Sequence, residues 1–575
     1  MLLYSAGMYV KITKSGPRRY VQLVESFRDE NGRSKQRTIA SLGRLENLDS
    51  NVDSVIAGLL RAASREAGPS SSEAAGADLS VSFDSARAIG DVWALTQLWQ
   101  ELGFDSLRKV FRHSSHQIDI EALLRIMVFN RLCDPESKLG MLRWLETVSL
   151  PGLGLKSVEH QHLLRAMDAL IDQQSAVDTL VSGLLRPLVD QQLSVVFYDM
   201  TTIRAAGLSQ QTGDIRKFGM AKEGLVKRQV MLGVVQTADG LPIFHEVFAG
   251  NTAEVKTLKP TLEKVLARFP IKRVIVVADR GLLSTHNLDE LKGMRLPSGA
   301  PLEFILAVPG RRYSDFIDIL SPFHHAQCTD ASAEVIGEAT WQDLRLVIAH
   351  DPDAAADKSQ KRDQKIETLE QQAAQWSGKL DEQDTGKKSR GRCLSDGGVR
   401  ARFYHAVSDA HLAKIIRVDL KSELFSYHID EKALQHARLM DGKLLLVTNT
   451  PDLAPAEVVS RYKALADIER GFRVLKSEIE IGPVYHRLPD RIKAHASICF
   501  IALILYRVMR QRLRAAETGL SPERALYQLR RVQHHCIKVN NKPITGISTI
   551  STEQKGVLAS LKVSKPSEKG QLSLL

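Results

Sequence analysis

Apolar and polar residues alternate with a period of two near the N-terminus, which predicts β-strands. The turn-forming sequence from Asp29 to Gly32 separates the second alternating run from the third and predicts a hairpin. We therefore expect a small basic β module over residues 1–62. A linker rich in Ala, Ser, Gly and Glu is expected at residues 63–85. The three alternating runs are residues 9–13, 20–27 and 37–43.

The spacing of apolar residues becomes helical over residues 86–192. In residues 118–129, for example, the apolar positions follow the 3.6-residue period of an amphipathic helix. This pattern predicts a helical domain, to which we assign a role in DNA binding.

Strand signals return after residue 192. The first predicted strands follow one another closely, which is typical of antiparallel pairing, and the later ones alternate with helices, which is typical of parallel pairing. The region therefore predicts an α/β fold with a mixed sheet. Strands are expected at residues 194–199, 229–236, 241–248, 273–279 and 303–308, and helices at residues 254–268 and after Ser284.

Residues 313–440 interrupt this order with a β-like piece at residues 344–350 and a charged helix at residues 354–382. A strand signal at residues 443–449 then leads into another helical stretch. We interpret the interruption as an insertion that splits one catalytic domain. The expected parts are the first catalytic segment at 193–312, the insertion at 313–440, the second catalytic segment at 441–515, and a C-terminal helical region and tail at 516–575.

Three acidic residues are candidates for metal binding. Asp199 and Asp279 each close an apolar strand run, and Glu469 lies in the helical stretch 461–476. Taken singly, such acids are more often turn, cap or surface residues. Together they have the oxygen chemistry that a hard cation such as Mg²⁺ prefers, and sequential strands of one sheet commonly lie side by side.

If residues 461–476 form one helix, residues seven apart lie on one stripe, because that spacing offsets them by only about 20°. This places Tyr462, Glu469 and Lys476 together. An adjacent apolar stripe is expected to dock on the sheet, with Arg470 and Arg473 facing a polyanion. The apolar stripe consists of Leu465, Ile468, Phe472 and Leu475.

Charge and composition narrow the functional classes. The net charge of +11 and a pI near 9.3 favour nucleic acid as the partner. The five cysteines and 17 histidines show no spacing typical of zinc, and the scattered cysteines favour a reducing cytoplasm. The apolar segment 496–508 is too short for a bilayer, which needs roughly twenty residues, so we expect a buried helix and no membrane partner.

These residues resemble bacterial insertion-sequence transposases of the DDE class, in the group with the signature Tyr-x2-Arg-x3-Glu-x6-Lys, which comprises insertion-sequence family four and its relatives. Tyr462, Glu469 and Lys476 stand in that register, whereas Leu465 occupies the arginine position. Three further segments are similar to the group, namely residues 198–202, 278–281 and 240–251.

The resemblance implies a ribonuclease-H-like core interrupted before the last acid by a mainly β insertion. It further implies cut-and-paste transposition, in which Asp199, Asp279 and Glu469 hold two Mg²⁺ or Mn²⁺ ions for DNA cleavage and strand transfer. It also implies double-stranded transposon ends and target DNA as partners, a homodimer in the synaptic complex, and a location at the bacterial nucleoid. The candidate DNA-binding residues are Tyr462, Lys476, Arg473, Arg470, Arg280 and Arg461.

Other functions remain open from the sequence alone. A structure-selective nuclease of the same fold would share the three acids. An inactive DNA-binding scaffold would need the basic charge but not the three acids, and its helix at 354–382 would pair in a coiled coil. An aspartate-nucleophile phosphatase is disfavoured, because it needs a second aspartate at the position of Thr201.

Overall fold

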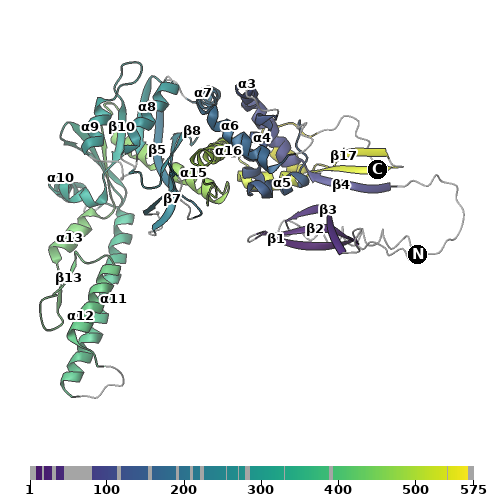
Figure 1. Ribbon diagram of the computed structural model, residues 1–575. Helices are drawn as coiled ribbons and strands as arrows, with labels where there is room; N and C mark the ends of the chain where they lie inside the picture. Colours follow the sequence, from purple (N-terminus) through teal and green to yellow (C-terminus); the bar gives the residue numbers. More distant parts are fainter. Residues whose placement is uncertain are drawn as a thin grey trace. The chain divides into compact units, whose positions relative to one another are not determined.

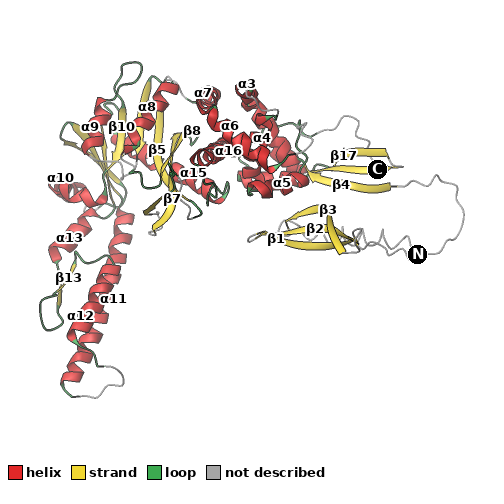
Figure 2. Cartoon of the chain, in the orientation of Figure 1, coloured by secondary structure: helices red, strands yellow, loops and turns green. Residues whose placement is uncertain are grey.

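The computed structural model divides the chain into two compact units (Figures 1 and 2). The first unit comprises residues 1–189, 200–252 and 467–575, and the second comprises residues 190–199 and 253–466. The structure describes residues 8–15, 18–28, 34–44, 81–112, 118–152, 158–189, 193–207, 212–220, 226–253, 256–269, 271–278, 285–328, 331–386, 393–539 and 542–566.

The second unit is built on a sheet with the strand order β11-β12-β15-β10-β9-β5. Strands β5, β9 and β10 run parallel, and β15 is antiparallel to both β10 and β12. The mixed sheet predicted from the sequence is therefore present. The strands are β5 (Leu193–Arg204), β9 (Arg273–Ala278), β10 (Glu303–Ala307), β11 (Val335–Trp341), β12 (Leu344–His350) and β15 (Lys443–Thr448).

The central strands of this sheet are apolar, which allows helices to cover them. From Val274 to Ala278, every residue of β9 is buried, as expected for a parallel strand with both faces covered. Helix α14 packs against β9, β10, β11 and β12. The helices of this part are α8 (Leu258–Arg268), α9 (Thr285–Gly293) and α14 (Pro455–Lys463).

The insertion is mainly helical, so the expectation of a mainly β insertion at 313–440 was wrong. Its two longest described strands, β11 and β12, extend the main sheet, and the short pair β13 and β14 forms a separate two-stranded sheet. We call the excursion between β12 and β15 the arm. It contains α11 (Pro352–Asp384), α12 (Asp396–Asp409), β13 (Ile416–Val418), β14 (Tyr427–Ile429) and α13 (Glu431–Met440).

The arm is helical because α11 carries one apolar stripe over 33 residues. Ile366, Leu369 and Ala373 are buried in a core that also includes Phe403 and Val407 of α12. The stripe is therefore covered within its own chain. This removes the exposed apolar face that the coiled-coil alternative requires.

In the first unit, the C-terminal part of β5 belongs to a sheet in which β5 lies beside β7, and β7 pairs antiparallel with β6 and β8. Helix α16 packs against β8 and against the helices α4 and α6. The elements are β6 (Lys217–Met220), β7 (Val226–Thr237), β8 (Pro242–Ala249), α4 (Ile120–Cys133), α6 (His160–Asp172), α15 (Ala466–Ser477) and α16 (Pro489–Ala515).

Among the described residues, α16 is the one helix whose length and composition would allow it to cross a membrane. Its most apolar 18-residue window has a mean hydropathy of 1.6, and 94% of that window is buried inside the structure. A core helix passes the same test. The burial agrees with the helix predicted at residues 496–508, although α16 is longer than expected.

The helical stretch predicted at 86–192 contains α2 (Gly90–Glu101), η3 (Phe104–Ser106), α3 (Leu107–Phe111), α4, α5 (Lys138–Thr147), α6, α7 (Gln174–Leu185) and η4 (Arg186–Leu188). At the N-terminus, β1 (Met8–Ser15), β2 (Arg18–Arg28) and β3 (Ser34–Arg44) form an antiparallel three-stranded sheet.

The C-terminal region was expected to be helical, but it also supplies two strands. Strand β16 pairs with β17 and with β4, which includes the last residues of the segment predicted as a linker. Residues 63–80 of that segment lie outside the described residues. The elements are β4 (Val81–Ala88), α17 (Pro522–Arg530), β16 (Gln533–Val539), β17 (Lys542–Ile547) and α18 (Thr552–Ser560).

Candidate active site

The first predicted acid, Asp199, lies within β5 and is only 6% exposed. Its neighbour Tyr198 is fixed by strand pairing with Ala278 and by a hydrogen bond of 2.6 Å between its hydroxyl and that of Thr257. Side chains two apart on a strand point to the same face. Asp199 and Thr201 therefore share one face of β5, opposite to the face of Tyr198.

The second predicted acid, Asp279, follows directly on the last residue of β9, Ala278. Asp279 and the DNA-binding candidate Arg280 both lie outside the described residues. The structure thus places Ala278, at the end of β9, opposite Tyr198 of β5. The roles of Asp279 and Arg280 stay predictions.

The third predicted acid, Glu469, lies on the exposed side of α15. The apolar stripe predicted beside it is confirmed, because Leu465, Ile468, Phe472 and Leu475 are all buried. The polar positions Glu469, Arg470, Arg473 and Lys476 are exposed. The amphipathic pattern thus orients α15 and leaves its acidic and basic residues accessible.

The stretch 461–476 is not one helix, so the prediction that Tyr462 shares a helical stripe with Glu469 and Lys476 was wrong, whereas Glu469 and Lys476 both lie on α15 and are both exposed. Helix α14 ends at Lys463 and α15 begins at Ala466. At the break, the amide of Leu465 donates to the carbonyl of Tyr462 at 2.9 Å, a tighter turn than the i−4 pattern of an α-helix. Tyr462 therefore lies on α14, and its helical register does not carry over to Glu469.

A cavity of about 440 Å³ opens beside Glu469. It is lined by the Glu469 carboxylate, the hydroxyl residues Thr201 and Ser477, the apolar Phe472, and the cationic Arg473 and Lys476. A carboxylate can bind a hard cation, whereas arginine and lysine can bind phosphate oxygens. The cavity thus combines the two kinds of group that a metal-dependent reaction on a phosphodiester requires.

Helix α15 approaches its neighbours closely on the side away from solvent. Gly471 lies where an added Cβ would be 2.8 Å from Nη2 of Arg507 on α16 and 3.4 Å from Oε1 of Gln236 on β7. Both polar residues are buried, Arg507 at 3% exposure. These residues were not predicted from the sequence, although a glycine in the middle of an amphipathic helix is a signal of close packing.

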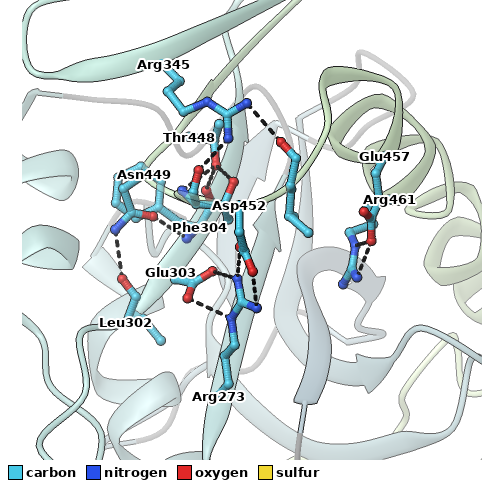
Figure 3. A network of polar contacts seen from close by, with 12 residues as sticks. Arg273, Leu302, Glu303, Phe304, Arg345, Thr448, Asn449, Asp452, Glu457 and Arg461 are labelled. Atoms are coloured by element: carbon cyan, nitrogen blue, oxygen red, sulfur yellow. Dashed lines mark hydrogen bonds and ion pairs between the residues drawn. The ribbon is translucent and has the colours of Figure 1, made fainter.

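The DNA-binding candidate Arg461 forms an ion pair with Glu457 on α14, one helical turn away, at 2.6 Å. Figure 3 shows this pair beside a larger network in the second unit. There Arg273 of β9 bonds Glu303 of β10 at 2.8 Å and also Asp452, which follows β15. The hydrogen bond from Arg273 lowers the pKa of Asp452. This network connects the first residues of β9 and β10 with the segment that follows β15, and we assign it a structural role.

Comparisons with known proteins were consistent with these features. Residues 190–505 match the family described as the transposase DDE domain, and residues 10–73 match the N-terminal domain of IS1634 family transposases. No curated protein matched. A solved structure of the piggyBac transposase synaptic complex with hairpin DNA is similar over 77% of this chain and 80% of that chain, with 8% identity and a TM-score of 0.36. A similarity at that score supports no conclusion about function.

Proposed function

The chain belongs to the transposase DDE domain family, whose match covers residues 190–505, and on that premise we propose that it catalyses cut-and-paste transposition of an insertion sequence. In this proposal it binds the transposon ends, cleaves the DNA strands and joins the freed ends to a target. The observation that carries the proposal is the cavity on α15, where Glu469 lies beside Arg473 and Lys476.

Asp199, Asp279 and Glu469 are proposed to hold two Mg²⁺ or Mn²⁺ ions. The donor set fits, because all three residues offer the carboxylate oxygens that hard cations prefer. A bound cation would also offset the cost of keeping the buried Asp199 ionised. When bound, two such ions activate an attacking hydroxyl and stabilise the leaving oxygen.

The chain's own residues bind and orient the DNA in this proposal. Arg473 and Lys476 supply charge-assisted contacts to the phosphate next to the cleaved bond. Phe472 anchors α15 in the core, so that Glu469 is held on a rigid element rather than on a loop. Leu465 is buried and does not replace the signature arginine as a phosphate contact.

The finer family assignment is also a proposal. The order β10-β9-β5 fits a ribonuclease-H-like core, with Asp199 directly after the last residue of β5 that pairs with β9, and Asp279 directly after β9 in the sequence. Glu469 and Lys476 fit the last part of the family-four signature. Double-stranded ends and target DNA are the proposed partners, with two copies of the chain holding the two ends.

Cleavage of a labelled transposon-end duplex in Mg²⁺ tests the proposal. The variants are Asp199→Asn, Asp279→Asn and Glu469→Gln, which remove a charge at nearly constant volume. Each should abolish cleavage and leave end binding in a gel-shift assay largely intact, because DNA affinity comes mainly from basic residues. The matched control is Glu370→Gln on the exposed side of α11, which should cleave like the wild type.

A second assay separates the alternatives. A pre-cleaved end with a free 3′-hydroxyl is offered to a plasmid target, and joined products are counted. A transposase joins the end to the plasmid, whereas a structure-selective nuclease only cuts. A wild-type chain that binds ends but neither cuts nor joins would support the inactive scaffold and overturn the proposal.

A further inference from the structure

Three side chains of metal-ligating type, from two segments of the chain, converge at the base of the arm. His324 and Cys328 lie on one π-helical turn (His324–Cys328) that follows α10 (Ile317–Phe323), and His350 ends β12. One possible ligand atom from each of the three residues lies within 4.8 Å of the other two. Among the described residues, no other group of three His, Cys, Asp or Glu meets this criterion. The sequence did not predict the group, because its spacing is not typical of zinc.

The two imidazole rings present their lone pairs to one point. Nζ of Lys443 lies 3.0 Å from Nδ1 of His324 and 3.0 Å from Nδ1 of His350. A lysine ammonium has only donors, so both Nδ1 atoms are acceptors there. The ring of His350 also bonds the backbone of Asp441, an arrangement that orients metal-binding histidines in many proteins. The site is thus already arranged to receive a cation.

We propose that this cluster is a structural Zn²⁺ site formed by Nδ1 of His324, Nδ1 of His350 and the thiolate of Cys328. Binding releases one proton from the Cys328 thiol, and the ammonium of Lys443 moves away from the two Nδ1 atoms. Nitrogen and sulfur donors select a borderline-soft ion such as Zn²⁺ over Mg²⁺. The site is therefore chemically separate from the carboxylates proposed to hold Mg²⁺.

Burial supports a structural rather than a catalytic role. Cys328 and His350 are each only 4% exposed, Lys443 is also buried, and His324 is half-buried, so little room is left for a substrate. Zinc sites closed to substrate stabilise a fold, whereas catalytic zinc sites keep one position open.

The location indicates what the ion would stabilise. His350 and Lys443 are direct register partners on β12 and β15, the two strands between which the arm leaves and re-enters the sheet. The turn bearing His324 and Cys328 precedes both strands in the sequence and also contributes to this cluster. A bound ion would tie this turn to β12 at the base of the arm and limit the bending of the arm.

The experiment uses the purified full chain, loaded with Zn²⁺ and then dialysed against metal-free buffer. Atomic emission should find one Zn²⁺ per chain. After replacement by Co²⁺, the near-ultraviolet spectrum should show the charge-transfer band of a cobalt thiolate. Cys328→Ser should lose this band, and His350→Gln should lose most of the bound metal. The matched control, Cys393→Ser, removes an exposed cysteine and should keep both signals.

Two further measurements guard against misfolded variants. In the wild type, Zn²⁺ should slow maleimide labelling of Cys328 in a mass-spectrometric assay and leave the rate at Cys393 unchanged. Lys443→Met should still retain Zn²⁺ and the cobalt band, since all three proposed ligands remain. A wild type that retains no Zn²⁺ overturns the proposal, as does a cobalt band that survives Cys328→Ser. Because none of these readouts uses DNA cleavage, the outcome is independent of the transposase proposal.

Discussion

Gly471 of α15 lies close to the Arg507 side chain of α16, because a Cβ on residue 471 would lie 2.8 Å from Nη2 of Arg507. The contact lies two residues beyond Glu469 on the same helix. Arg507 is buried at 3% exposure, so its guanidinium would have to shift within the core to admit that Cβ. The small size of Gly471 therefore allows α15, which carries the candidate catalytic Glu469, to lie close to Arg507.

Gly471→Ala should destabilise the protein by roughly 1 to 3 kcal/mol, the usual cost of overpacking a well-packed core. It should also reduce DNA cleavage more than end binding, because the substitution displaces the segment carrying Glu469. Chemical denaturation and the cleavage assay measure the two effects. Gly378→Ala is the matched control, since it lies within α11 with open space around its Cβ. That control should be neutral or more stable by up to about 1 kcal/mol.

Leu465→Ala should destabilise the chain by about 2 to 5 kcal/mol, because it leaves a cavity where a buried side chain packs at the break between α14 and α15. Denaturant midpoints give the change. The salt dependence of end binding should stay as in the wild type, since Leu465 contacts no phosphate in the proposed complex. A stability unchanged from the wild type would contradict its place in the core.

Lys476→Ala should weaken binding to transposon-end DNA and reduce the slope of log K against log salt by about 0.9, the expected loss for one phosphate contact on a duplex. Fluorescence anisotropy at several salt concentrations measures the slope. Lys379→Ala on the exposed side of α11 is the control of equal charge change. An equal change in slope for both variants would mean that Lys476 contributes only to general attraction.

The low pKa of Asp214 predicts that the free energy of unfolding decreases in acid. Hydrogen bonds and charge from Arg216, with further charge from Arg228, lower the pKa of Asp214 to about 2. A carboxyl group whose pKa falls on folding contributes stability above its unfolded value near 4, and this stability is lost as the pH falls from about 4 to 2. Asp214→Asn should therefore cost about 2 kcal/mol at pH 7, and the difference from the wild type should shrink toward pH 2. Denaturation across this pH range tests the sign.

The sequence predicts those parts of the fold whose signals are local. The apolar runs at β5 and β9 identified both strands, and the stripe through Ile468 and Phe472 identified the buried face of α15. The break between α14 and α15 was missed because the stretch 461–476 contains no proline and its one glycine, Gly471, lies elsewhere. A helical period therefore continues through the break without interruption.

The signals for the arm and for the histidine and cysteine cluster are not local. Strands β11 and β12 look like part of an insertion in the sequence, and only pairing with β15 makes them part of the main sheet. His324, Cys328 and His350 come from two segments that the sheet brings together, with no spacing that marks them as a set. Such groups become visible when long-range strand register is known.

The arm leaves and returns at almost the same place. The amide of Asp351 bonds the carbonyl of Gly442 at 2.9 Å, just beyond the paired residues His350 and Lys443. In topological terms, the roughly 90 residues between are therefore a very long hairpin loop, and the entropy of closing a loop rises only slowly with its length. The arm could thus be lengthened, shortened or exchanged at little cost in free energy to the sheet from which it projects.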